Sequence, residues 1–189
     1  MSPHPYTPAE DTFLLEDSIS GLGEMERAAD IGCSTGYITS ALLKKAAEVV
    51  SIDIDPEALA AARERLSHEY GRTHLIQAWG LTAIRDGGVF DVVASNPPYL
   101  PDEDVDDATI FGGPTGVETS VAILAQASTR LRRGGLVLMV ASTLADLERL
   151  EDEACRLGFR IGVKGSWKGF FEEVKSLIFI FGSDSHVYY

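Results

Sequence analysis

Short apolar runs with the pattern of buried strands alternate with longer amphipathic segments along nearly the whole chain. This alternation is typical of parallel βαβ units, and strands that are apolar at almost every position are typical of a sheet covered by helices on both faces. No helical segment separates the last two strands, so residues 166–173 are expected to join them as an antiparallel hairpin. The sequence therefore predicts one α/β domain over residues 1–189, with a seven-stranded, mostly parallel sheet. The expected strands are 27–32, 49–54, 73–79, 90–96, 134–142, 159–165 and 174–182, and the expected helices are 7–22, 36–46, 56–70, 117–131 and 144–158.

Residues that favour helix starts precede three of these helices. A Thr or Asp side chain can accept hydrogen bonds from the free N–H groups of a first turn, a Glu three residues later can bond back, and proline suits the first helical position. The residues concerned are Thr7, Pro8 and Glu10 at the first helix, Asp55 and Pro56 at the third, and Thr115 and Glu118 at the fourth.

A glycine-containing turn, DIGCSTG at residues 30–36, follows the first strand and opens a helix. Gly32 and Gly36 permit a tight turn and a close approach of the backbone to a ligand, and the helix start presents free N–H groups. Asp53 lies 21 residues after Gly32, at the end of the second strand, where an acidic side chain can accept both hydroxyls of a ribose. This combination predicts a nucleoside cofactor, although the spacing differs from the G-x-G-x-x-G pattern of dinucleotide-binding proteins.

The same turn resembles the first motif of the class I methyltransferases, D-x-G-x-G-x-G, whose members bind S-adenosylmethionine. Ser34 replaces the middle glycine of that motif, and because serine is small the bend is expected to survive. The resemblance implies a Rossmann-like methyltransferase fold with S-adenosylmethionine as cofactor. It assigns cofactor contacts to Asp30, Gly32, Ser34, Gly36, Asp53 and Ile54.

The stretch NPPY, residues 96–99, ends the fourth strand. In this fold the fourth strand lies beside the first, so its end faces the cofactor at the topological switch point. The side-chain oxygen of Asn96 and the carbonyl of Pro97 are two rigidly held acceptors, since Pro98 has no N–H and the rings fix φ, and together they suit a planar –NH₂ group. Tyr99 offers a flat face on which an amide or a base can stack.

This arrangement fits a chemical need of N-methylation. The nitrogen of an amide or an aromatic amine is a poor nucleophile because its lone pair is delocalised. Hydrogen bonds that hold both of its hydrogens can make the lone pair available for in-line attack on a sulfonium methyl, and positioning supplies the rest. We therefore predict Asn96, Pro97 and Tyr99 as catalytic residues, residues 96–99 as substrate-binding, and Asn96 also as a neighbour of the cofactor.

NPPY at this place resembles the N-methyltransferases that act on glutamine or adenine amino groups. TPAEDTFLLEDSI at 7–19, DIDPEAL at 53–59 and GGPTG at 112–116 narrow the resemblance to the HemK-related branch, over nearly the whole chain. More closely, the chain is similar to archaeal and eukaryotic members, which methylate N5 of the glutamine in the Gly-Gly-Gln motif of class 1 peptide-chain release factors. This implies that a helix over about 8–22 covers the methionine end of the cofactor, with Thr12 near its carboxylate.

The sequence departs from this family after the third strand. Methyltransferases of this type often place an acidic residue there, near the adenine amino group, but this chain has QAWGL at 77–81. Trp79 could cover an adenine face, or the backbone of Gly80 and Leu81 could read the adenine edge. Trp79 is equally compatible with ordinary core packing.

The composition restricts other functions. The net charge of −13, from 29 acidic and 16 basic residues, opposes unaided binding to naked nucleic acid, although an acid-rich, Lys-poor surface also suits a halophilic source. No apolar run is long enough to span a bilayer and the first residues do not form a secretory signal, so a cytoplasmic location is expected. Cys33 and Cys155 have no metal-binding spacing; no metal site is predicted, and Cys33 is expected to be a small packed side chain.

Two other functions stay open at this point. The first is an adenine N6-methyltransferase acting on RNA or DNA, which NPPY alone does not exclude. Duplex DNA requires base flipping and a surface that holds the duplex, and the only basic clusters are LKK and LRR. The second is a cofactor-binding scaffold or the inert half of a heterodimer, which the intact NPPY stretch opposes.

The third strand, 73–79, is expected to be an edge of the sheet in the usual methyltransferase order. An apolar edge with few charges is a template for strand addition by another chain. The resemblance implies the same, because archaeal and eukaryotic members of this branch work as heterodimers with a small, often zinc-binding, activator protein. The alternative is that a loop of the same chain covers this edge.

Overall fold

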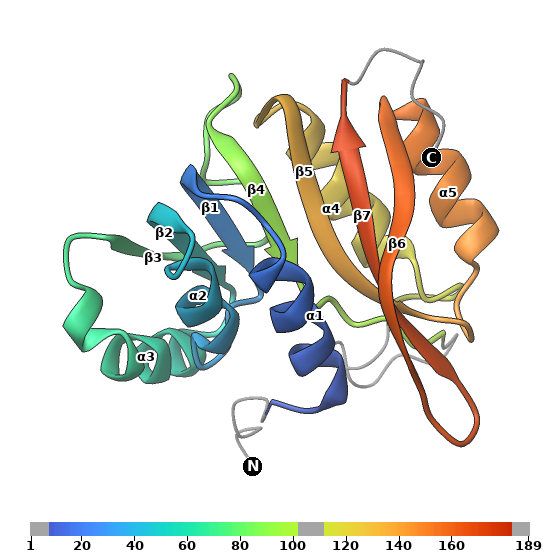
Figure 1. Cartoon of the computed structure of the whole chain (residues 1–189), viewed down its shortest axis with the longest axis horizontal. Coiled ribbons are helices and arrows are strands. Elements are labelled where there is room, and N and C mark those ends of the chain that lie inside the picture. The colour runs from blue at the N-terminus through green and yellow to red at the C-terminus, as the bar shows by residue number, and fades with distance from the viewer. Residues whose placement is uncertain (1–7, 102–111, 183–189) are drawn as a thin grey trace.

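A computed structural model describes residues 8–101 and 112–182 of the chain (Figure 1). They form a seven-stranded sheet in the order β3-β2-β1-β4-β5-β7-β6, which confirms the predicted number of strands, β3 as an edge strand and β4 beside β1. The strands are β1 (Met25–Ile31), β2 (Ala46–Asp53), β3 (Thr73–Gln77), β4 (Phe90–Ser95), β5 (Leu131–Ser142), β6 (Phe159–Lys168) and β7 (Glu173–Phe181). The helices are α1 (Glu10–Ser20), α2 (Tyr37–Leu42), α3 (Pro56–Arg65), a short 3₁₀ turn η1 (Ser67–Glu69), α4 (Glu118–Ser128) and α5 (Leu147–Arg156).

The first five strands run parallel, and the last two form the predicted antiparallel hairpin. β7 enters the sheet antiparallel to β5, so the loop between β6 and β7 points toward the carboxyl ends of the parallel strands. At those same ends, Ile31 of β1 pairs with both Ile52 of β2 and Ser95 of β4. The carboxyl ends of these strands therefore bring together the turn after β1, Asp53 and Asn96.

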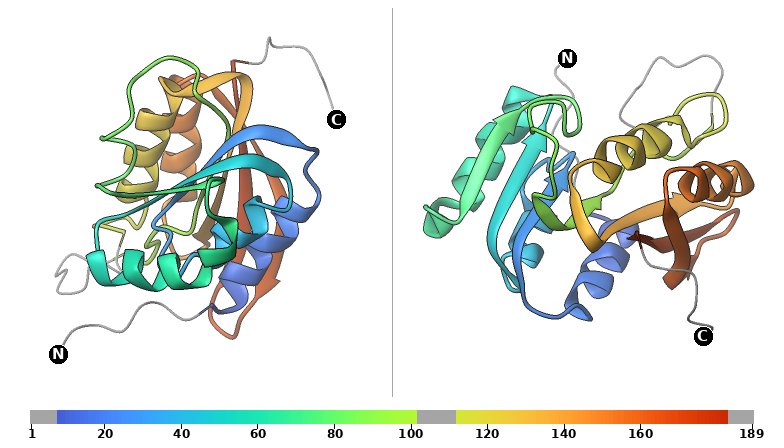
Figure 2. Two further views of the ribbon diagram at one scale, coloured as in Figure 1. Left: turned by 90° about the vertical axis from the view of Figure 1, so that its left-hand side faces the viewer. Right: turned by 90° about the horizontal axis from the view of Figure 1, so that it is seen from above.

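Helices cover both faces of the sheet (Figure 2). Residues of α4 and α5 form one apolar core with one set of strand side chains, including Ile31, Val93 and Met139. Residues of α1, α2 and α3 form a second core with the alternate strand positions, including Val49, Val92 and Leu138. The strands are apolar throughout because each of their two faces is buried against helices. Among the described residues, no helix combines the length and the apolar character needed to cross a membrane.

Several predicted boundaries were wrong. α2 ends at Leu42 instead of residue 46, because the chain turns at Leu43–Lys45 and Ala46 already pairs with Met25 of β1. β5 begins at Leu131 instead of residue 134, since Leu131 pairs with Phe90 across an irregular register. The helix predicted over 56–70 ends at Arg65 and continues as η1.

Helix capping was predicted only in part. Asp55 caps α3 by accepting a hydrogen bond from the Glu57 N–H, with Pro56 at the first position. At α4, Glu118 accepts hydrogen bonds from the Thr115 N–H and hydroxyl, but the residue before the helix is Val117 and no side chain caps it. α1 begins after Ala9 without a side-chain cap, and Thr7 lies outside the described residues.

Candidate active site

The turn after β1 is built from left-handed backbone positions. φ is 72° at Gly32 and 77° at Gly36, and Ser34 also adopts a positive φ of 46°, so the bend tolerates serine. A side chain at Gly36 would lie 3.3 Å from Cβ of Ala62, because the turn packs on α3. A side chain at Gly32 would meet no atom within 4 Å, which leaves open space beside the turn that a ligand can approach.

Asp53 joins this turn to the end of β2. Its Oδ2 accepts a hydrogen bond from the Ser34 N–H at 2.8 Å, and its Oδ1 accepts one from the Asp55 N–H at 3.0 Å. A carboxylate has about four lone-pair sites, so these two bonds leave acceptor capacity for ribose hydroxyls.

The surroundings of the residues after β2 and β3 change part of the predicted set of adenine contacts. Trp79 is 46% exposed and Ile54 is 64% exposed, so Trp79 is not a core residue. The Leu81 N–H, by contrast, is bonded to Oε1 of Gln126 on α4, and the Leu81 side chain is fully buried. The Leu81 N–H is therefore not free to bond an adenine edge. Of the two backbone positions predicted for that contact, only Gly80 remains a candidate.

Asp30 is buried at the end of β1. Its Oδ2 accepts a hydrogen bond of 2.6 Å from the Thr39 hydroxyl. Burial raises the pKa of Asp30 from 3.8 to about 7, with the nearby Asp53 charge adding to the rise and the Thr39 bond opposing it. Next to it, Cys33 is buried as predicted, and burial likewise raises the pKa of its thiol.

The NPPY segment is held by a residue of α1 that the sequence analysis did not single out. Asp11 is 7% exposed, and its Oδ2 accepts hydrogen bonds from Nδ2 of Asn96 at 3.0 Å and from the hydroxyl of Tyr99 at 3.1 Å. Its Oδ1 accepts a bond from the Thr12 N–H at 2.6 Å, and the Thr12 hydroxyl lies 3.3 Å from the same atom. The predicted residue Thr12 thus lies in this network as a neighbour of Asp11.

This network leaves one acceptor unpaired. An ionised carboxylate only accepts hydrogen bonds, so Asp11 fixes the Asn96 amide with its nitrogen toward α1. The other end of that amide, Oδ1, is buried without a hydrogen-bond partner. Buried polar atoms are nearly always paired, so an orphan acceptor at this place points to a donor supplied by a ligand.

The GGPTG segment supports the backbone of the NPPY loop. The Gly112 N–H donates to the Leu100 carbonyl at 2.9 Å. A side chain at Gly112 would lie 2.5 Å from the Pro98 carbonyl oxygen, and one at Gly116 would lie 2.7 Å from the Tyr99 carbonyl oxygen. Glycine is needed at both positions because two backbone segments lie in contact there.

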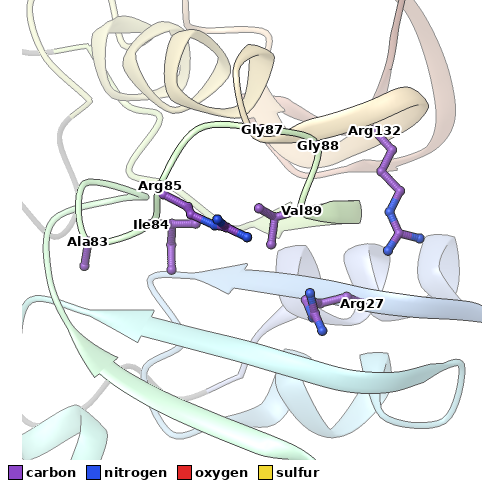
Figure 3. Close-up of a pocket in the computed structure, with 8 residues that line it drawn as sticks. All are labelled: Arg27, Ala83, Ile84, Arg85, Gly87, Gly88, Val89 and Arg132. Carbon is purple, nitrogen blue, oxygen red and sulfur yellow. The ribbon is translucent and has the colours of Figure 1, made fainter.

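A cavity of about 390 Å³ lies elsewhere, beside the amino ends of β1, β4 and β5 (Figure 3). Its arginines are largely occupied: Arg27 pairs with Glu48 at 3.0 Å, and Arg132 pairs with Asp91 at 2.8 Å. Asn96 and Asp53 lie at the carboxyl ends of their strands, so this cavity is separate from the candidate active site. Among the described residues, no group of His, Cys, Asp and Glu side chains could hold a metal ion.

The sheet order, the turn with Asp53, and Asn96 at the switch point together define a class I methyltransferase. The methyltransferase small domain family model matches residues 12–156, and the chain belongs to this family. Its cofactor is S-adenosylmethionine.

Individual relatives agree with this assignment. MJ0928 of Methanocaldococcus jannaschii, provisionally named a protein N5-glutamine methyltransferase, is 30% identical over 92% of this chain and 90% of its own. The eRF1 methyltransferase catalytic subunit mtq2 of Schizosaccharomyces pombe is 32% identical over 72% of this chain and 71% of its own. The E. cuniculi Mtq2–Trm112 complex, described as methylating the termination factor eRF1, superposes with a TM-score of 0.77 at 29% identity, covering 95% of this chain and 99% of that one. The chain spans only 51% to 60% of several bacterial relatives that it also matches.

Proposed function

We propose that this protein transfers a methyl group from S-adenosylmethionine to N5 of a glutamine side chain, in the Gly-Gly-Gln motif of a class 1 peptide-chain release factor. The observation that carries the proposal is the buried, unpaired Oδ1 of Asn96, whose amide is oriented by Asp11. The names of MJ0928, mtq2 and the E. cuniculi complex support the same reaction.

The residues at the carboxyl edge fit the cofactor. The open space beside Gly32 suits the close approach of the methionine part, and Asp53 suits the ribose hydroxyls. The exposed apolar side chains of Ile54 and Trp79 suit the two faces of an adenine, with Gly80 at its edge. Thr12, and with it Asp30, Ser34 and Gly36, complete the proposed cofactor-binding set. Bound there, S-adenosylmethionine supplies an electrophilic methyl group on its sulfonium.

The NPPY residues fit a primary amide. Oδ1 of Asn96 and the carbonyl of Pro97 each accept one hydrogen of the substrate –NH₂ group, while Tyr99 stacks on the amide plane and Pro98 keeps the loop rigid. Holding both hydrogens turns the nitrogen lone pair toward the methyl, so the N–C bond would form as the methyl–sulfur bond breaks, and the methylated nitrogen would then release one proton to water. Since Asp11 bonds both Asn96 and Tyr99, the Asn96 acceptor and the Tyr99 ring are preorganised and do not have to rearrange during the reaction.

A small zinc-binding activator is part of this proposal. β3 pairs only with β2 among the described strands, and its residues are half-buried or exposed. The E. cuniculi protein was solved in complex with Trm112, which supports a partner of that kind here. We place it on the free edge of β3, where it would add a strand and cover Leu75 and Ile76.

The test is a competition for the methyl group. The protein and its activator are incubated with labelled S-adenosylmethionine, a release factor, the same release factor with its motif glutamine changed to alanine, and bulk RNA and DNA. The proposal predicts label in the intact release factor alone. Label in RNA or DNA would instead establish the adenine N6-methyltransferase alternative.

A further inference from the structure

The tip of the β6–β7 hairpin, residues 167–172, carries exposed aromatic side chains. Phe170 is 99% exposed, Phe171 is 90% exposed, and their ring centroids lie 5.6 Å apart. Trp167, at the end of β6, is 40% exposed and lies against Gly169. Single exposed apolar residues are ordinary, but three aromatic rings gathered on one projection mark an interaction site.

The hairpin tip is fixed to the rest of the sheet. The Gly169 N–H donates to the Glu172 carbonyl at 2.8 Å, which closes the loop. The Ser142 hydroxyl at the end of β5 donates to the Glu172 carboxylate, and the Glu173 N–H donates to the Thr143 hydroxyl at 3.0 Å. A fixed projection loses little conformational entropy when it binds a partner.

The hairpin tip also lies at the carboxyl ends of the parallel strands, where the active site lies. β4 ends at Ser95, which pairs with Met139, and β5 continues past that point to Ser142. Ser142 pairs with Val174, and the hairpin extends further still to its tip. In Figure 1 the tip projects below the sheet, on the side toward which β1 and β4 point.

α1 connects the hairpin physically to the NPPY segment. The Ser18 hydroxyl donates to the Ser176 hydroxyl of β7 at 2.7 Å, and a side chain at Gly165 of β6 would lie 3.1 Å from Leu14. The same helix carries Asp11, which bonds Asn96 and Tyr99. A protein that contacts the hairpin tip therefore lies on the same side of the sheet as the reacting centre, with α1 between them.

The charge of the hairpin is unusual for this chain. Three of the five lysines, Lys164, Lys168 and Lys175, lie on β6 and β7, against two acids, Glu172 and Glu173, although the net charge of the whole chain is −13. Glu173 lies close enough to Lys168 and Lys175 to offset part of their charge. Aromatic rings beside ammonium groups fit a partner surface that is apolar at its centre and acidic around it. An activator on β3 would not occupy this surface, since β3 and β6 are the two opposite edges of the sheet.

We propose that the hairpin tip is the docking surface for the folded protein substrate, with Phe170 and Phe171 as its apolar anchors and the hairpin lysines facing acidic residues of that substrate. This rests on the proposed function, because it assumes a protein whose glutamine enters the active site. The hairpin tip would then supply affinity for the substrate outside the motif that reacts.

The double variant F170S/F171S tests this, with Cys155→Ser as the control, because Cys155 is exposed near the end of α5 and lies neither in the hairpin tip nor beside β3. Each protein is assayed with its activator on an intact release factor and on a short peptide containing Gly-Gly-Gln. We expect KM for the intact factor to rise about tenfold or more in the double variant, with kcat, peptide methylation and cofactor affinity unchanged.

The outcomes separate the two proposals. An unchanged KM in the double variant, while the wild type methylates the factor, would overturn the docking surface and leave the proposed function intact. A wild type that methylates no release factor would overturn the proposed function itself. Loss of activator binding in the double variant would assign the hairpin tip to the activator and would also overturn the docking surface.

Discussion

Nδ2 of Asn96 lies 3.0 Å from Oδ2 of Asp11, although the two residues are 85 positions apart in the sequence. The bond decides which end of the Asn96 amide faces α1 and leaves its oxygen as a buried acceptor without a partner. The Tyr99 hydroxyl bonds the same carboxylate oxygen. One acidic side chain on the first helix therefore orients two residues of the NPPY segment.

Replacing Asp11 with alanine is expected to reduce kcat by about a hundredfold, because the Asn96 amide loses the bond that orients it and small misplacements of catalytic groups are costly. Asp11→Asn should recover part of the loss, since its amide oxygen can still accept from Asn96. Asp17→Asn, an exposed change on the same helix, is the control and should leave kcat unchanged. Steady-state kinetics provide the measurement, and an Asp11→Ala protein with normal kcat would show that Asp11 does not position Asn96.

Asp53→Asn is expected to weaken S-adenosylmethionine binding by about tenfold or more, because a charged acceptor for the ribose hydroxyls becomes a neutral one. Asp55→Asn is the matched control: it lies two residues away, and asparagine caps helices as well as aspartate does. Isothermal titration calorimetry measures both affinities. Equal affinity in the two variants would remove Asp53 from the cofactor site.

Asp30 predicts a dependence of stability on pH. The pKa of Asp30 is raised to about 7 in the folded protein, so the folded state holds this proton more tightly than the unfolded state. Its contribution to stability is therefore present at low pH and is lost as the pH rises through about 7. Thermal unfolding of the wild type and of Asp30→Asn checks this. The Tm of the variant minus the Tm of the wild type should increase between about pH 5 and about pH 8. A difference that is constant with pH would contradict the raised pKa.

Because we place the activator on β3, we expect the chain to depend on the activator for solubility and activity. The chain alone should scatter light as aggregates or show weak activity, and adding the activator should give a one-to-one complex with higher cofactor affinity. Light scattering and cofactor titration with and without the activator measure this. A soluble, fully active monomer that gains nothing from the activator would exclude a partner on β3.

The sequence predicted the features that depend on local patterns. The alternation of apolar runs and helices predicted a mostly parallel sheet, and the missing helix before the last strand predicted the hairpin. The resemblance to class I methyltransferases predicted that β3 is an edge strand and that β4 lies beside β1. The turn residues placed Asp53 and NPPY at strand ends. Boundaries failed where tertiary pairing overrides local propensity, as in the pairing of Ala46 with Met25 that shortens α2. The suggested role of the Leu81 backbone at the adenine edge was wrong for a similar reason, because Oε1 of Gln126 on α4 accepts the hydrogen bond of the Leu81 N–H.

The role of Asp11 could not be predicted from spacing. Its carboxylate is within hydrogen-bonding distance of Asn96 and Tyr99 only because α1 packs against the carboxyl edge of the sheet, and no local pattern encodes a contact over 85 residues. The available signal was an acidic residue directly before Thr12, in a first turn where acids are common in any case.

Single-turnover methylation of a release factor by the wild type and by Asn96→Ala tests the proposed reaction most directly, with cofactor affinity measured in parallel and the methylated residue located by mass spectrometry. We expect the wild type to methylate the glutamine of the Gly-Gly-Gln motif at its side-chain nitrogen. The variant should fold, bind S-adenosylmethionine with little change and transfer methyl at least about a hundredfold more slowly, because the amide loses an acceptor that acts in the transition state. Near-normal transfer by Asn96→Ala would show that Asn96 does not hold the reacting amide, and a methyl group on any other residue would overturn the proposed substrate.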